Sequence, residues 1–135
     1  MKKFKFLEHT ADIKFQSFGN SIEETFSNCA LAMFNAMYDG KVKSKIKSKI
    51  KVKGNDNESL LYNFLEELLF LFDSKGFFLS EIRTLEIKDN ILKAEITGDN
   101  AKNYKISIDV KAITYNDMFI KKVGNKFIAQ VVLDV

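Results

Sequence analysis

The chain has 135 residues and a formal net charge of +3, with 21 lysines and arginines against 18 aspartates and glutamates. A dedicated nucleic-acid-binding protein usually has a larger basic excess, so this charge permits an anionic partner without requiring one. A single cysteine excludes an internal disulfide and suits a reducing compartment, so we expect a cytoplasmic protein without a disulfide partner. No apolar run approaches the roughly 20 residues of a membrane-spanning helix, and we expect no membrane association.

The first half of the chain alternates between strand and helix patterns. Apolar and polar residues alternate over 3–8 and 12–18, which predicts two strands. Ser21-Ile22-Glu23-Glu24 has the spacing of a capping box and predicts a helix over 21–38 that ends at Asp39-Gly40. A lysine then occupies every odd position from 41 to 53, which predicts one long strand or ribbon with a lysine face.

The second half contains one more helix and a run of strands. A helix over 57–74 is apolar around most of its circumference, which predicts a central helix covered on more than one side. The strands that follow are expected at 80–88, 91–98, 104–115, 119–123 and 126–133, with turns at Asp89-Asn90, Asn116-Asp117 and Gly124-Asn125. The fold class is therefore α+β, a single domain over 1–135 in which two helices pack against an antiparallel or mixed sheet with a C-terminal meander.

The segment Glu8-His9-Thr10-Ala11-Asp12 interrupts the alternation at the junction of the first two strands. Polar side chains on rigid strand ends often carry function, because the scaffold holds them in place. His9 is the only histidine, and Cys29, the only cysteine, is expected to be a packed core thiol, so a zinc site of nitrogen and sulfur ligands is not supported. His9 has either a structural or a functional role.

The carboxylates at the two ends of the chain suggest a cation site. If the last strand returns beside the first ones, Asp12, Asp134 and the backbone oxygens of Val135 meet. Such hard oxygen donors suit Ca²⁺, Mg²⁺ or Mn²⁺. Lys111, expected at the end of strand 104–115, is either a counter-ion of these carboxylates or a solvent-exposed lysine.

The alternating lysines from Lys41 to Lys53 have two interpretations. They form a basic stripe for RNA or DNA phosphates, or they form a solvated strand face that also discourages strand-to-strand aggregation. No aromatic residue lies between the lysines, so a base-stacking platform is missing.

Several segments together resemble the archease family across essentially the whole chain. They are Glu8-His9-Thr10-Ala11-Asp12, Ser21-Ile22-Glu23-Glu24-Thr25-Phe26, Leu65-Glu66-Glu67-Leu68-Leu69, Leu71-Phe72-Asp73, Lys111-Ala112-Ile113-Thr114-Tyr115 and Asp134-Val135. The resemblance implies an accessory protein, not itself an enzyme, that activates an RtcB-type RNA ligase in tRNA splicing by promoting guanylylation and multiple turnover of the ligase. The protein would contact tRNA only indirectly, through the ligase.

The resemblance also implies roles for individual residues. Asp12, Asp134 and Val135 correspond to the family's divalent-cation site, with Ca²⁺ as the implied ion, and Lys111 corresponds to the family's lysine. His9 and Lys111 are the candidates for the activation site. The family pattern usually continues Thr-Tyr-His, whereas this chain has Asn116, which does not titrate near neutral pH.

Two other functions remain compatible with the residues. One is a metal-dependent phosphoester hydrolase that acts at the same acidic site. The other is an RNA-binding module or chaperone that uses the lysines between Lys41 and Lys53.

Overall fold

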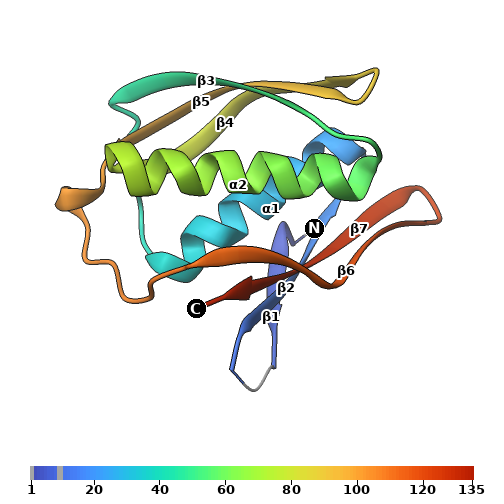
Figure 1. Cartoon of the computed structure of the whole chain (residues 1–135), viewed down its shortest axis with the longest axis horizontal. Helices are drawn as coiled ribbons and strands as arrows, with labels where there is room; N and C mark the ends of the chain where they lie inside the picture. The colour runs from blue at the N-terminus through green and yellow to red at the C-terminus, as the bar shows by residue number, and fades with distance from the viewer. Residues whose placement is uncertain (1, 9–10) are drawn as a thin grey trace.

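Two antiparallel sheets enclose two helices, which gives the protein three layers (Figure 1). The computed structural model describes residues 2–8 and 11–135. In chain order the elements are β1 (Phe4–Leu7), β2 (Ile13–Gly19), α1 (Ile22–Met37), β3 (Ile46–Lys53), α2 (Asn57–Lys75), β4 (Phe77–Lys88), β5 (Ile91–Asn100), the 3-10 turn η1 (Ala101–Asn103), β6 (Ala112–Val123) and β7 (Lys126–Asp134).

The two sheets draw their strands from different parts of the chain. One sheet has four strands in the order β1-β2-β7-β6, and the other has three in the order β3-β5-β4. Each of the neighbouring pairs is antiparallel. α1 contacts β2 and β7 on one side and β4 on the other, while α2 contacts β6 on one side and β3 and β4 on the other. The predicted α+β class is confirmed, and the helices lie between the sheets.

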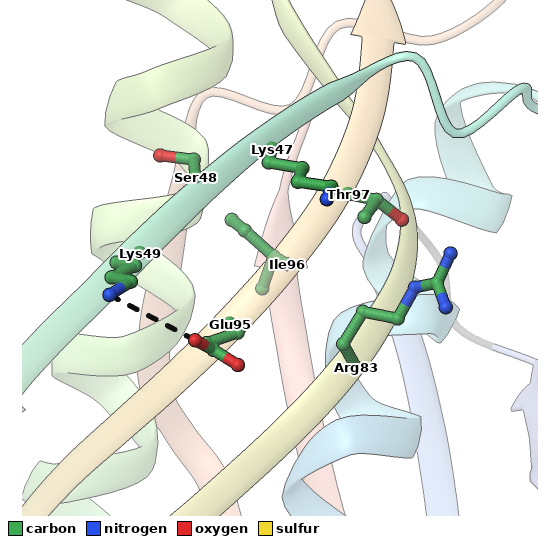
Figure 2. A pocket seen from close by; sticks show the side chains of 7 residues that line it. All are labelled: Lys47, Ser48, Lys49, Arg83, Glu95, Ile96 and Thr97. Atoms are coloured by element: carbon green, nitrogen blue, oxygen red, sulfur yellow. Dashed lines mark ion pairs between the residues drawn. The ribbon is translucent and has the colours of Figure 1, made fainter.

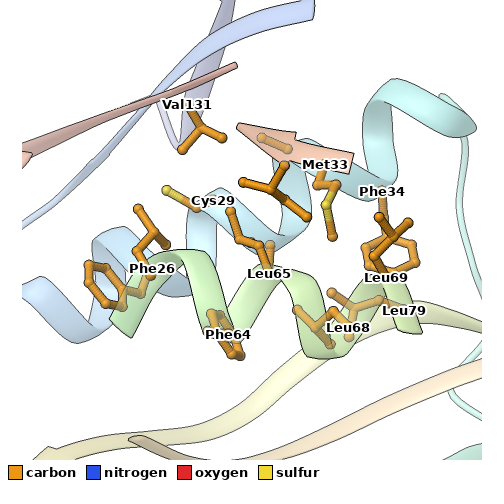
Figure 3. Packing of buried hydrophobic residues seen from close by; sticks show 14 of the residues in the cluster. Phe26, Cys29, Met33, Phe34, Phe64, Leu65, Leu68, Leu69, Leu79 and Val131 are labelled. Atoms are coloured by element: carbon orange, nitrogen blue, oxygen red, sulfur yellow. The ribbon is translucent and has the colours of Figure 1, made fainter. Parts of the chain in front are cut away.

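The position of α2 between two sheets explains its apolar circumference. Leu65 points toward α1 and Val131, whereas Phe64 and Leu68 point toward the sheet that contains β4 (Figure 3). All three of these α2 side chains are fully buried. Cys29 of α1 is also fully buried, as expected for a core thiol. The expectation of a central helix covered on more than one side is therefore confirmed.

Short-range hydrogen bonds explain where the helices begin and end. The Ser21 hydroxyl caps α1 by accepting from the Glu24 N–H at 3.0 Å, while the Glu24 carboxylate accepts from Asn20 and not from Ser21. The reciprocal capping box lies instead at α2, between Asp56 and Ser59. Gly76 ends α2 in the left-handed conformation at φ 65°, which glycine adopts without steric cost.

Two strand predictions need correction. The predicted strand over 41–53 begins only at Ile46, because the backbone of Lys43 is bound by a side chain from outside the sheet. The Lys43 N–H donates to the Tyr104 hydroxyl at 2.8 Å, and that hydroxyl donates to Asp99 at 2.7 Å. The bond from Tyr104 also lowers the pKa of the buried Asp99 carboxyl.

The second correction concerns residues 104–123. Strand 104–115 and a turn at Asn116-Asp117 were expected, but 104–111 is not a strand and β6 runs without a turn from Ala112 to Val123. A bulge lies between Thr114, which pairs with Val132, and Phe119, which pairs with Gln130. Asp117 has a positive φ of 56°, so the local turn signal in the sequence marks a bulge.

The two hairpin turns are confirmed. Asp89 and Asn90 join β4 to β5 with φ of 53° and 60°, and Gly124 joins β6 to β7 with φ of 64°. In the described part of the chain, none of the helices has the length and hydropathy to cross a membrane.

Candidate functional site

The antiparallel pairing of β2 and β7 brings the two ends of the sequence together. The last pair in this ladder is Ile13 with Leu133. Asp12 and Asp134 are the residues next to this pair, Asp12 just before β2 and Asp134 at the end of β7, so the same register continued by one residue would set them opposite each other. The convergence of Asp12 and Asp134 therefore stays a prediction, and it is the second strand and not the first that pairs with the last.

Lys111 reaches the same corner from the start of β6. Its backbone N–H donates to the Asp134 carbonyl at 2.8 Å, and the next residue, Ala112, pairs with Asp134. Asp134 and Lys111 are exposed, whereas Asp12 is half-buried. Val135 packs against the hydrophobic core, which fixes the end of β7. We name the set Asp12, Lys111, Asp134 and Val135 the strand-end corner.

The segment after α1 adds one further acidic side chain, Asp39, to a pocket that Asp12 also lines. A pocket of about 410 Å³ is lined by Glu8, Asp12, Asn35 and Asp39, among others. The Asn35 amide donates to the Asp39 carboxylate at 3.1 Å. Sequence reasoning treats Asp39 only as part of a helix end, whereas α1 ends at Met37 and Asp39 lies two residues later, in the lining of this pocket.

The strand-end corner carries oxygen donors of the type that a hard divalent cation prefers. Asp12 and Asp134 supply carboxylate oxygens, Val135 supplies backbone oxygen, and like charges facing each other across strands are unfavourable without a compensating positive charge. Within residues 2–8 and 11–135, no three Asp, Glu, His or Cys side chains are grouped so that they could hold a metal ion. A cation here would therefore depend on the Val135 oxygens and on water beyond the two aspartates.

The lysine closest in sequence to Asp12 has a different partner. Lys14 forms an ion pair with Asp117 in the β6 bulge at 3.2 Å, and its side chain is only 19% exposed. The Gln130 amide holds the same bulge by donating to the Asp117 carbonyl at 2.8 Å. These contacts tie β6 to β2 and β7, with β7 between the other two strands, so the corner rests on three connected strands.

The remaining sequence-derived candidates are less informative. His9 lies outside the residues that the structure describes. Asn116, which replaces the usual histidine of the pattern, is exposed, and its backbone N–H donates to the Thr114 hydroxyl at 3.1 Å. The neighbouring Tyr115 stacks on Tyr62 of α2 with ring centroids 4.3 Å apart, a contact that local sequence patterns do not reveal.

A second pair of acidic residues, Asp73 and Asp109, lies outside the strand-end corner. Partial burial, and then the negative charge of Asp109, raise the pKa of the Asp73 carboxyl near the end of α2. Asp109 lies two residues before Lys111 in the segment that leads into β6.

Comparison with known proteins agrees with the architecture. The model of the Archease protein family (MTH1598/TM1083) matches residues 4–135. The chain belongs to the archease family. A protein archease of Pyrococcus abyssi is 41% identical over the full length of both chains. A protein archease of Methanosarcina acetivorans is 38% identical, with 99% of this chain and 97% of the relative covered.

Solved structures show the same fold. The solution structure of protein 1598 of Methanobacterium thermoautotrophicum covers 100% of both chains with a TM-score of 0.85 at 33% identity. A crystal structure from Thermotoga maritima, described as an archease and possible chaperone, has a TM-score of 0.67 at 23% identity, with 97% and 96% of the two chains covered. The second likeness concerns the fold alone.

Proposed function

We propose that this archease activates an RtcB-type RNA ligase in tRNA splicing, in the cytoplasm, without catalysing a complete reaction of its own. Membership of the archease family over residues 4–135 supports the proposal. The observation that carries it is the β2–β7 register, in which Ile13 pairs with Leu133, the immediate neighbours of Asp12 and Asp134.

In this proposal Asp12, Asp134 and Val135 hold one divalent cation, with Ca²⁺ as the first candidate and Mg²⁺ or Mn²⁺ as alternatives. The cation supplies a fixed positive charge at the tip of the protein. Lys111 adds a second positive charge beside Asp134, to which its backbone is already bound. The strands below hold these groups in place, so little reorganisation is needed when a ligase docks.

His9 and Lys111 are the proposed contacts with the ligase. Their task is to position groups near the ligase's guanylylation centre, and the RNA ends are joined by the ligase alone. tRNA is therefore reached through the ligase. Asn116 takes no part in proton transfer, because an amide does not titrate near neutral pH.

The test uses purified archease with the RtcB-type ligase of the same organism, GTP, Mn²⁺ and RNA carrying a 2′,3′-cyclic phosphate and a 5′-hydroxyl. We expect archease to increase both ligase guanylylation and the number of turnovers. Asp12→Asn and Asp134→Asn should each lose most of this stimulation, because the amide keeps the shape but removes the charge that a cation needs.

Asp89→Asn is the matched control. It makes the same chemical change at an exposed hairpin position with φ of 53°, where asparagine is well tolerated. Equal stimulation by the wild type, Asp12→Asn and Asp134→Asn would refute the role of the corner, and unchanged ligase turnover on adding wild type would refute the function. Phosphoester hydrolysis by archease alone would favour the hydrolase instead.

A further inference from the structure

The outer face of the β3-β5-β4 sheet carries a concentration of positive charge that the proposed function does not use. Its inner face packs against the helices, with Ile50, Leu92, Ala94 and Ile96 buried. Two adjoining depressions of about 470 and 680 Å³ lie along the three strands. Five cations line them, and we name this set the basic sheet face: Lys47, Lys49, Lys51, Arg83 and Lys93.

The lysines lie on one face because of the strand period. Lys47, Lys49 and Lys51 are two residues apart on β3, so they project to the same side at intervals of about 6.6 Å. Figure 2 shows Lys47, Lys49 and Arg83 together with Glu95 and Thr97 over the three strands. The three lysines of β3 thus form a regular row of positive charges.

Carboxylates neutralise only part of this charge. Lys49 pairs with Glu95 at 3.9 Å, and Arg83 pairs with Glu81 at 3.2 Å. In the described part of the chain, Lys47, Lys51 and Lys93 make no ion pair within 4.0 Å. Lys93 lies directly opposite Lys51 of β3 and Glu86 of β4, and the close placement of Lys51 and Lys93 is one that a bound anion would relieve further.

Protection of a sheet edge explains only part of the arrangement. Lysines on the edge strand β3 would discourage pairing with another chain. Lys93, however, lies on β5, which is the central strand of this sheet. Its charge extends the basic sheet face inward from the edge, as a surface for a polyanion requires.

We propose that the basic sheet face binds RNA through its phosphate backbone, without reading the base sequence. The regular charge spacing suits a polymer that carries one negative charge at each repeat. The lining of the depressions includes charged, hydroxyl and aliphatic residues but no aromatic residue, so base stacking is not available. The lack of a lining aromatic also argues against insertion into a lipid surface, which uses protruding apolar side chains.

The test measures fluorescence anisotropy of labelled single-stranded RNA 15-mers with the whole protein and no ligase, at about 50 mM salt, where weak electrostatic binding is strongest. We expect binding that weakens with salt with a logarithmic slope of about −2, as three phosphate contacts to a single strand predict. Oligomers of adenosine and of uridine should bind within about threefold of each other, because no contact distinguishes the bases.

The decisive variant combines Lys47→Gln, Lys51→Gln and Lys93→Gln. We expect it to lose at least tenfold in affinity and most of the salt slope. Its matched control combines Lys121→Gln, Lys122→Gln and Lys126→Gln on the hairpin of the other sheet, where all three lysines are exposed. Both variants have the same net charge, so a difference between them reports the place of the lysines.

Several outcomes would overturn the proposal. They are no RNA binding at low salt, equal losses in the two triple variants, or binding to anionic phosphatidylserine vesicles but not to RNA. Asp134→Asn should bind RNA like the wild type. RNA binding by the basic sheet face and stimulation of the ligase are therefore tested separately, and either proposal can fail without the other.

Discussion

The central place of α2 predicts that leucines on its two sides are equally costly to truncate. Leu65 faces α1 and Val131, whereas Leu68 faces the sheet of β3, β4 and β5 (Figure 3). Both side chains are 0% exposed. Leu→Ala at buried sites costs about 2.7–5.0 kcal/mol, more where the surroundings cannot collapse into the cavity. Sheets close this layer on both sides, so we expect each variant to lose about 4 kcal/mol of unfolding free energy.

Urea denaturation followed by circular dichroism measures this loss. With a urea slope of about 2 kcal/mol per molar, each variant should shift the midpoint down by roughly 2 M without a change of slope. Phe70→Ala on the same helix is the control, since Phe70 is 57% exposed and should cost less than about 1 kcal/mol. A loss near 4 kcal/mol for one leucine and below about 1.5 kcal/mol for the other would refute burial of α2 on both sides.

Two further predictions concern titration. The hydrogen bond from the Ser59 N–H lowers the pKa of the Asp56 carboxyl below its ordinary value, so its contribution to stability is present above the unfolded-state pKa and is lost as pH falls through the folded-state pKa. Urea midpoints at pH 7 and pH 3 should therefore differ more for wild type than for Asp56→Asn, and identical differences would contradict this. Complete burial raises the pKa of the Cys29 thiol to about 12, so at pH 8 a thiol-specific disulfide reagent should react with it only after unfolding in concentrated urea. Rapid stoichiometric labelling of the folded protein would contradict the buried thiol.

The sequence predicts those parts of the fold that depend on local patterns. The apolar circumference of 57–74 indicates a helix covered on several sides, and the Asp89-Asn90 and Gly124-Asn125 pairs indicate hairpin turns. The helix is indicated by the spacing of its apolar residues, and the hairpin turns are indicated by residues that tolerate a positive φ. These features need no knowledge of distant residues.

The errors arise where distant residues override the local pattern. Lysines 41–45 alternate like a strand, yet Tyr104, 61 residues away from Lys43, binds the backbone there. Asn116-Asp117 has the composition of a turn, yet β7 pairs with β6 on both sides of it. Local sequence does not distinguish a bulge from a turn, because both need a residue that accepts positive φ.

In the candidate site too, local patterns predict some features, while others depend on distant residues. The sequence predicts that Asp12 and Asp134 meet at strand ends, and in the structure their neighbours Ile13 and Leu133 pair between β2 and β7. Asp39 was missed, because its position beside Asp12 depends on how α1 crosses the sheet. The roles of His9, Lys111 and Val135 remain predictions for the ligase experiment.

The bulge in β6 has a mechanical consequence. On one side Asp117 is held by Lys14, and on the other Tyr115 stacks on Tyr62 of α2. The ring stack therefore resists sliding of the four-stranded sheet along α2, while the ion pair ties β6 to β2 within that sheet. A force applied at the end of β7 by a docked protein would therefore be transmitted through β6 to the rest of the sheet and to α2.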